Sequence, residues 1–170
     1  MCYYLQIVSP LSLTEIRSML PPGFSADIAP MTWQAVLRPR LPGAQTVATL
    51  RIGGCACALR AARDGEDEHH LRRRYAGLGL SRDRIIAALE RHRRGGAPAG
   101  VPATWRAALA GFVAEHARNA GPTLYYLGFS VEPGEGLPGI PGEAGMLSAA
   151  AVRAAAETWL DENRLTEVTR

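Results

Sequence analysis

The sequence predicts a mixed α/β domain, α/β or α+β in class, with a small three- to four-stranded sheet covered by about five helices. Stretches rich in β-branched and aromatic residues predict the strands, and amphipathic stretches between them predict the helices. Hydrophobic residues make up 47% of the 170 residues and charged residues 21%, a balance typical of a globular domain. We therefore expect residues 1–170 to form a single domain.

The first quarter of the chain predicts one strand, one short helix and a long irregular segment. Residues 3–8 are aromatic and β-branched, which favours a strand. Ser12 and Glu15 have the spacing of a capping box, so a short helix is expected to begin there. Residues 21–45 contain five prolines and are expected to be irregular, apart from a short helix or strand at 31–37.

The remainder of the chain predicts two strands, four helices and one loop rich in glycine and proline. A helical face at 102–119 carries Trp105, Leu109 and His116. The expected elements, in order, are a strand at 46–52, helices at about 66–78, 82–94 and 102–119, a strand at 123–131, the loop at 133–146 and a helix capped by Ser148.

Export and membrane insertion are not expected. The first 20 residues lack the basic start of a signal peptide, and Glu15 and Arg17 interrupt their apolar stretch. No run approaches the roughly 18 apolar residues of a membrane span. Three cysteines without an export signal are expected to be reduced thiols. We expect a cytoplasmic protein with no membrane partner.

The basic residues define which chemistry is open to the chain. All 19 of them are arginines, so Schiff-base lysines, phosphate-loop lysines and Ser–Lys dyads are excluded. The net charge is only +3 because 16 carboxylates offset the arginines. This balance is compatible with an acidic partner, either nucleic acid or an acidic protein surface, without requiring one.

Cys55 and Cys57 predict a soft-metal site. On extended backbone, residues i and i+2 point to the same side, so two thiolates can share one tetrahedral Zn²⁺ at about 2.3 Å each. His69 or His70 and Cys2 would complete the ligand set. Cys2 can approach only if the strand at 3–8 runs antiparallel to the strand at 46–52. The alternatives are that Cys55 and Cys57 are small buried hydrophobic residues, or that they form a redox pair.

The segment 71–85 resembles the helix-turn-helix pattern of DNA-binding proteins. Gly79 falls in the turn, Ser81 opens the second helix and Ile85 is its buried anchor. The resemblance implies a recognition helix at Arg82–Arg93, and its nucleic-acid contacts would be Arg82, Arg84, Arg91 and Arg94. Tyr75 departs from the small residue that the pattern usually has there. The alternative is an ordinary helical hairpin with a solvated basic face.

Signals for catalysis are weak. Removal of Met1 would expose Cys2 as an N-terminal nucleophile. Residues 134–139 match GxGxxG in letters, but Pro138 is incompatible with the expected start of a helix, so we expect no dinucleotide site. We expect a small binding domain rather than an enzyme. The first hypothesis is a zinc site, and the alternatives are nucleic-acid binding through 68–94 and a protein-partner module.

Overall fold

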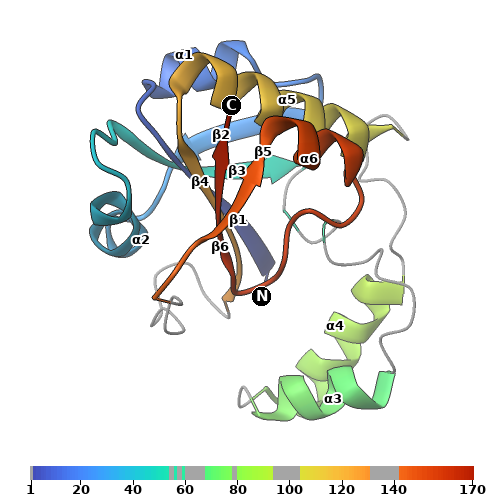
Figure 1. Ribbon diagram of the computed structural model, residues 1–170. Coiled ribbons are helices and arrows are strands. Elements are labelled where there is room, and N and C mark those ends of the chain that lie inside the picture. The colour runs from blue at the N-terminus through green and yellow to red at the C-terminus, as the bar shows by residue number, and fades with distance from the viewer. Residues whose placement is uncertain are drawn as a thin grey trace.

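The computed structural model describes residues 2–53, 56, 59, 68–77, 80–93, 104–130 and 142–170. One six-stranded sheet runs through these residues in the order β2-β3-β1-β4-β6-β5 (Figure 1). Its strands are β1 (Cys2–Ser9), β2 (Phe24–Ile28), β3 (Thr46–Ile52), β4 (Thr123–Ser130), β5 (Gly145–Ser148) and β6 (Leu165–Thr169).

Six α-helices lie in the described ranges. They are α1 (Leu13–Ser18), α2 (Met31–Leu37), α3 (Glu68–Gly77), α4 (Arg82–Arg93), α5 (Trp105–Ala120) and α6 (Ala149–Ala154), and a 3-10 turn, η1 (Arg38–Arg40), follows α2. The mixed α/β class is confirmed, whereas the expected sheet of three or four strands is too small. No helix in these ranges is long and apolar enough to cross a membrane.

The first strand is the centre of the sheet. β1 pairs antiparallel with β3 on one side and with β4 on the other, so that Leu5 lies between Leu50 and Leu127. β2 extends the sheet beyond β3, and β6 extends it beyond β4, both antiparallel. β5 is the edge strand next to β6 and pairs with it in parallel. The sheet is therefore mixed, with antiparallel pairs dominant.

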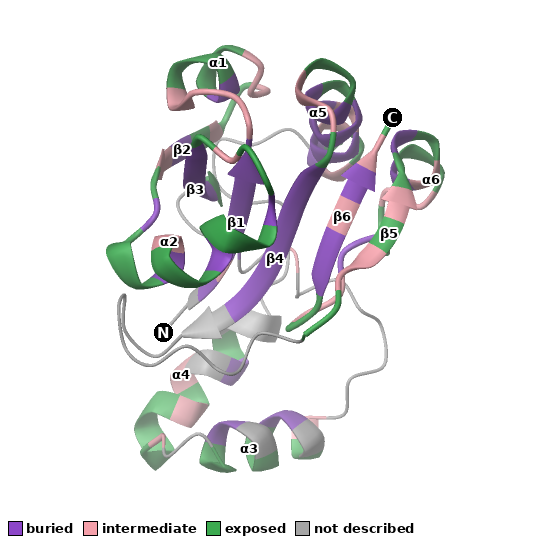
Figure 2. Cartoon of the chain, turned by 60° about the vertical axis from the view of Figure 1, so that its left-hand side comes forward, coloured by how far each residue is buried: buried purple, intermediate pink, exposed green. Residues whose placement is uncertain are grey.

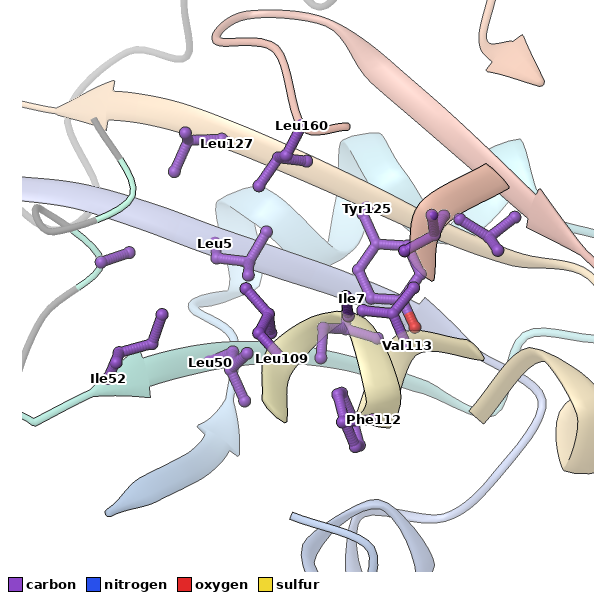
Figure 3. Close-up of a cluster of buried hydrophobic side chains, with 14 of the residues drawn as sticks. Leu5, Ile7, Leu50, Ile52, Leu109, Phe112, Val113, Tyr125, Leu127 and Leu160 are labelled. Carbon is purple, nitrogen blue, oxygen red and sulfur yellow. The ribbon is translucent and has the colours of Figure 1, made fainter. Parts of the chain in front are cut away.

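One face of the sheet carries the larger hydrophobic core, under α1, α5 and α6 (Figures 2 and 3). The side chains of this face alternate along each strand, as Leu5 and Ile7 do in β1. Trp105, Leu109 and His116 of α5 are all buried against it, which confirms the helical face expected from the sequence. The core fixes α5 across β1, β3 and β4.

The other face is covered over part of its length by α2. Trp33 and Leu37 of α2 pack on Val8, Val47 and Tyr126. The rings of Trp33 and Tyr126 lie 5.4 Å apart, centroid to centroid. Central strands buried on both faces explain why hydrophobic residues run almost without interruption through β1 and β4.

The sequence missed β2, β5 and β6. β2 lies inside the segment expected to be irregular, and β5 begins within the loop expected at 133–146. β6 follows α6, where no strand was expected. Each of the three has only four or five residues and lies outside the central strands, so its alternation of buried and exposed positions is too short to stand out.

Two helix caps expected from the sequence, at Ser12 and Ser148, are present. Glu15 N–H donates to Ser12 Oγ, while the Glu15 carboxylate accepts from the Ser12 N–H at 2.8 Å, which completes the capping box. At α6, Ser148 Oγ accepts from the N–H of Ala151. These bonds satisfy backbone donors that have no partner inside the helix.

Gly128 in β4 allows the Trp33–Tyr126 contact. A Cβ at this position would lie 2.6 Å from Tyr126 Cε1 and 3.2 Å from Trp33 Cη2. We expect Gly128→Ala to lower the free energy of unfolding by about 1–3 kcal/mol, because two packed rings must shift. Urea denaturation measures the change.

Gly111 supplies the control for this substitution. It lies in α5, and a Cβ there would meet nothing within 4 Å. Gly111→Ala should leave the free energy of unfolding unchanged or raise it by up to about 1 kcal/mol, because alanine favours helix. Equal effects of the two substitutions would contradict the proposed crowding at Gly128.

Candidate functional site

The helices α3 and α4 form a hairpin with its own small core. Leu71 and Tyr75 of α3 pack against Leu89 of α4, with Leu80 and Ile85 beside them. This core is separate from the two cores of the sheet, and the hairpin stands apart from the sheet (Figure 1). We refer to residues 68–93 as the basic hairpin.

The local sequence explains how the hairpin forms. α4 begins at Arg82, directly after Ser81, and the Ile85 N–H donates to the Ser81 carbonyl. The bounds of α4 match the helix expected from the helix-turn-helix resemblance. Tyr75, the departure from that pattern, is only 3% exposed and lies in the core between the helices. A large side chain therefore occupies the crossing where the pattern has a small one.

Positive charge is concentrated in the basic hairpin. Its 26 residues hold seven arginines and three carboxylates, a net charge of +4, whereas the rest of the chain holds twelve arginines and thirteen carboxylates. The remainder therefore carries a net charge of −1. A charge gathered on one projecting element produces a stronger local field than the same charge spread over the surface.

An open groove of about 500 Å³ runs along one side of the basic hairpin. It is formed by two helical stripes, one on each helix, whose members are three or four residues apart. We call it the hairpin groove, and it is lined by His69, Arg72, Arg73 and Ala76 of α3 and by Arg82, Ile85 and Ile86 of α4.

The lining surface of the groove is mainly apolar, although three of its residues are arginines. Ile86 is 41% exposed, so part of its apolar surface is in contact with solvent. Arg72 donates to Glu68 at 2.9 Å, which partly offsets its charge. In the part of the chain that the structure describes, Arg73 and Arg82 have no ion pair. Their charges are therefore open to a ligand in the groove.

Of the four arginines expected to contact nucleic acid, the structure describes the side chains of Arg82 and Arg84. Arg82 lines the hairpin groove, whereas Arg84 is exposed on α4 and does not line it. Arg91 lies in the last turn of α4, and Arg94 is outside the described residues. The groove instead brings in Arg72 and Arg73 of α3. Helical spacing places Arg72 and Arg73 on one side of α3, but it does not show which face of α4 they meet.

The expected metal ligands are only partly within the described residues. Cys55 and Cys57 lie outside them. Cys2 begins β1, while His69 and His70 lie in α3, where the exposed side chain of His69 forms part of the groove wall. Among the described residues, no three Cys, His, Asp or Glu side chains form a group that could hold a metal.

The antiparallel strand pairing that would let Cys2 approach Cys55 and Cys57 is present. β1 and β3 run antiparallel, so the start of β1 lies at the end of β3 that leads to residue 55. The N–H of Ala56 donates to the carbonyl of Tyr3 at 3.2 Å, which ties the Cys-x-Cys segment to the residue after Cys2. The metal site remains a prediction.

A second polar cluster, which the sequence analysis did not find, lies inside the sheet core. His116 Nε2 is 2.8 Å from Ser9 Oγ, and His116 Nδ1 is 2.6 Å from the Tyr125 hydroxyl. Ser9 Oγ also accepts from the Leu11 N–H, and the Phe112 ring stacks on the imidazole. Ser9 and His116 are 107 residues apart, so no local signal could have paired them.

This cluster joins elements rather than performing chemistry. A serine beside a histidine is the arrangement of an activated nucleophile, but Ser9, His116 and Tyr125 are all fully buried, with 0% exposure. Burial lowers the pKa of His116 to about 4 and raises the pKa of Tyr125 above its usual range, so both are neutral. The cluster ties α5 to the ends of β1 and β4.

Comparison with known proteins finds no counterpart: no family model, no curated protein and no solved structure matches the chain. The function must therefore be inferred from the geometry of the hairpin groove and of the other sites.

The buried histidine makes stability depend on pH. His116 has a pKa of about 4 in the folded chain and of about 6.5 when unfolded, so the unfolded state gains its proton first as pH falls. This group should remove about 2 kcal/mol of stability between pH 7 and pH 5, and its effect should level off below pH 4.

The measurement is urea denaturation at several pH values, with His116→Gln for comparison. Glutamine cannot take up a proton in this range, so the variant should start less stable but lose less stability on acidification. A loss of the same size in the variant would assign the pH dependence to other groups.

Proposed function

We propose that this chain is a binding domain whose basic hairpin holds an acidic, amphipathic helix of a partner protein. The observation that carries the proposal is the hairpin groove, which is lined by apolar Ile85 and Ile86 together with Arg73 and Arg82. A groove of this kind suits a ligand that has apolar side chains on one face and carboxylates beside them.

The shape of the groove favours a helix as the ligand. Two packed helices leave a furrow between them, and a third helix fills such a furrow by laying its side chains between theirs. The groove residues of α3 are three or four positions apart, the same spacing at which a bound amphipathic helix would present its contact residues. They are His69, Arg72, Arg73 and Ala76. Burial of Ile86 would remove apolar surface from water and so contribute to affinity.

The charge of the hairpin favours an acidic ligand. The net charge of +4 lies on 26 residues, and Arg73 and Arg82 line the groove on opposite helices. Carboxylates on both edges of a bound helix would meet one guanidinium each. Solvent-exposed charge pairs of this kind set the orientation and the association rate more than the affinity.

Nucleic acid is the competing ligand, and the helix-turn-helix resemblance favours it. Phosphate binding would use exposed guanidinium groups anywhere on the hairpin, Arg84 included, and would leave Ile86 without a role. The two ligands therefore depend on different residues. Arg84 separates them, because it is exposed on α4 but lies outside the groove.

A helical peptide of about 18 residues, with leucines along one face and glutamates on its flanks, tests the groove. We expect Arg73→Ala and Arg82→Ala each to weaken binding about 3- to 10-fold, since each removes one charge pair. Ile86→Ala should weaken binding to a similar extent through lost apolar contact. Fluorescence anisotropy of the labelled peptide measures these changes.

Arg84→Ala is the matched control and should leave the affinity for the peptide within about 2-fold. A scrambled peptide of the same composition should bind weakly. Tight binding of duplex DNA instead, falling steeply from about 50 to 200 mM salt and weakened by Arg84→Ala but not by Ile86→Ala, would replace the protein ligand by nucleic acid.

We also propose a soft-metal site around Cys55 and Cys57, which the bond between Ala56 and Tyr3 supports by bringing this segment to the start of β1. Cys2 and one of His69 and His70 would complete the ligands. The site could serve structure as well as sensing.

Elemental analysis of reduced protein, purified without a tag or chelator, tests the metal site. We expect about one equivalent of zinc, lost in Cys55→Ser and in Cys57→Ser, because each thiolate supplies one of four ligands. Less than about a tenth of an equivalent in the unaltered chain would contradict the site.

A further inference from the structure

A second cavity lies among the last three elements of the chain, β5, α6 and β6. Its volume is about 280 Å³, slightly below the range of pockets that hold drug-sized ligands. Its walls are about equally polar and apolar, and the apolar part includes Leu147, Ala151, Ala155 and the indole of Trp159. A ligand here must be small.

The polar part of the cavity includes one positive and one negative side chain, together with Thr158 and Thr166. Arg164 Nη1 and Asp161 Oδ2 are 3.5 Å apart, and both side chains line the cavity. This separation is longer than a close charge-assisted hydrogen bond. Both side chains are about half exposed, so the pair contributes little to stability.

The guanidinium of Arg164 occupies space beside β5 that a side chain at Gly145 would fill. A Cβ at Gly145 would lie 2.8 Å from Arg164 Nη2 and 2.9 Å from Arg164 Nε, so any other residue here would displace the guanidinium. The position of the positive charge therefore depends on a missing side chain.

The segment that carries these groups is anchored on both sides. The Trp159 ring packs edge-on against the Tyr125 ring, with the ring centroids 5.5 Å apart, and Trp159 is only 6% exposed. The N–H of Asn163 donates to the Leu127 carbonyl at 2.8 Å. Asp161 and Arg164 lie between or beside these anchors. A site that is formed before its ligand arrives loses less freedom on binding.

We propose that this cavity binds a free α-amino acid with an apolar side chain, such as leucine. The carboxylate of the ligand would accept from the Arg164 guanidinium, and its ammonium would donate to the Asp161 carboxylate. The side chain would enter the apolar part beside Leu147 and Trp159. A zwitterion matches the two opposite charges at the mouth, whereas a simple acid or amine matches only one.

Isothermal titration calorimetry with three related compounds tests the proposal. L-leucine should bind saturably with a dissociation constant of about 1 mM or lower. The compounds 4-methylpentanoate and isoamylamine, which lack its ammonium and its carboxylate respectively, should each bind about tenfold more weakly. Absence of saturable L-leucine binding, or equal binding of 4-methylpentanoate, would overturn the amino-acid site.

Substitutions locate the binding. Arg164→Gln and Asp161→Asn should each weaken L-leucine binding about tenfold, while Arg153→Gln, an exposed arginine of α6 that does not line the cavity, should have no effect. The tryptophan fluorescence change on adding L-leucine should disappear in Trp159→Phe. An effect of Arg153→Gln equal to that of Arg164→Gln would overturn the site.

Discussion

The fold depends on the burial of β1, β3 and β4 on both faces. Because these strands have no solvent-exposed face along most of their length, helices must cover the sheet on both sides: α1, α5 and α6 on one, α2 on the other. Polar side chains trapped there need partners, since an unpaired buried polar group is costly. Thr49 donates to Gln6, and His116 bonds to Ser9 and Tyr125, for this reason. The polar clusters of the core follow from the sheet.

The three central strands of the sheet could be predicted from the sequence, but the three outer strands could not. β1, β3 and β4 are long and apolar, and the Ser12–Glu15 capping box marks a helix start within four residues, so local patterns sufficed. β2, β5 and β6 gain their strand conformation from pairing with neighbours already in place. Strand pairing of this kind produces no recognisable sequence pattern in a segment of four or five residues.

The candidate site shows the same division. The hairpin and the bounds of α4 could be predicted, because Ser81 and the apolar spacing of Ile85 and Leu89 are local signals. The set of arginines that share a surface could not be predicted, because it depends on how α3 and α4 are rotated about their common core. Tyr75 in that core helps to set the rotation. The groove therefore groups Arg73 with Arg82, whereas reading α4 alone had grouped Arg82 with Arg84.

The separation of charge between the hairpin and the rest of the chain has a consequence for kinetics. A net +4 on a projecting element, set against a net −1 on the remainder, gives the molecule an electric dipole. Such a molecule turns in the field of an acidic partner before the two surfaces touch. A larger fraction of collisions then leads to binding. This fraction falls as the ionic strength rises, because dissolved ions screen the field.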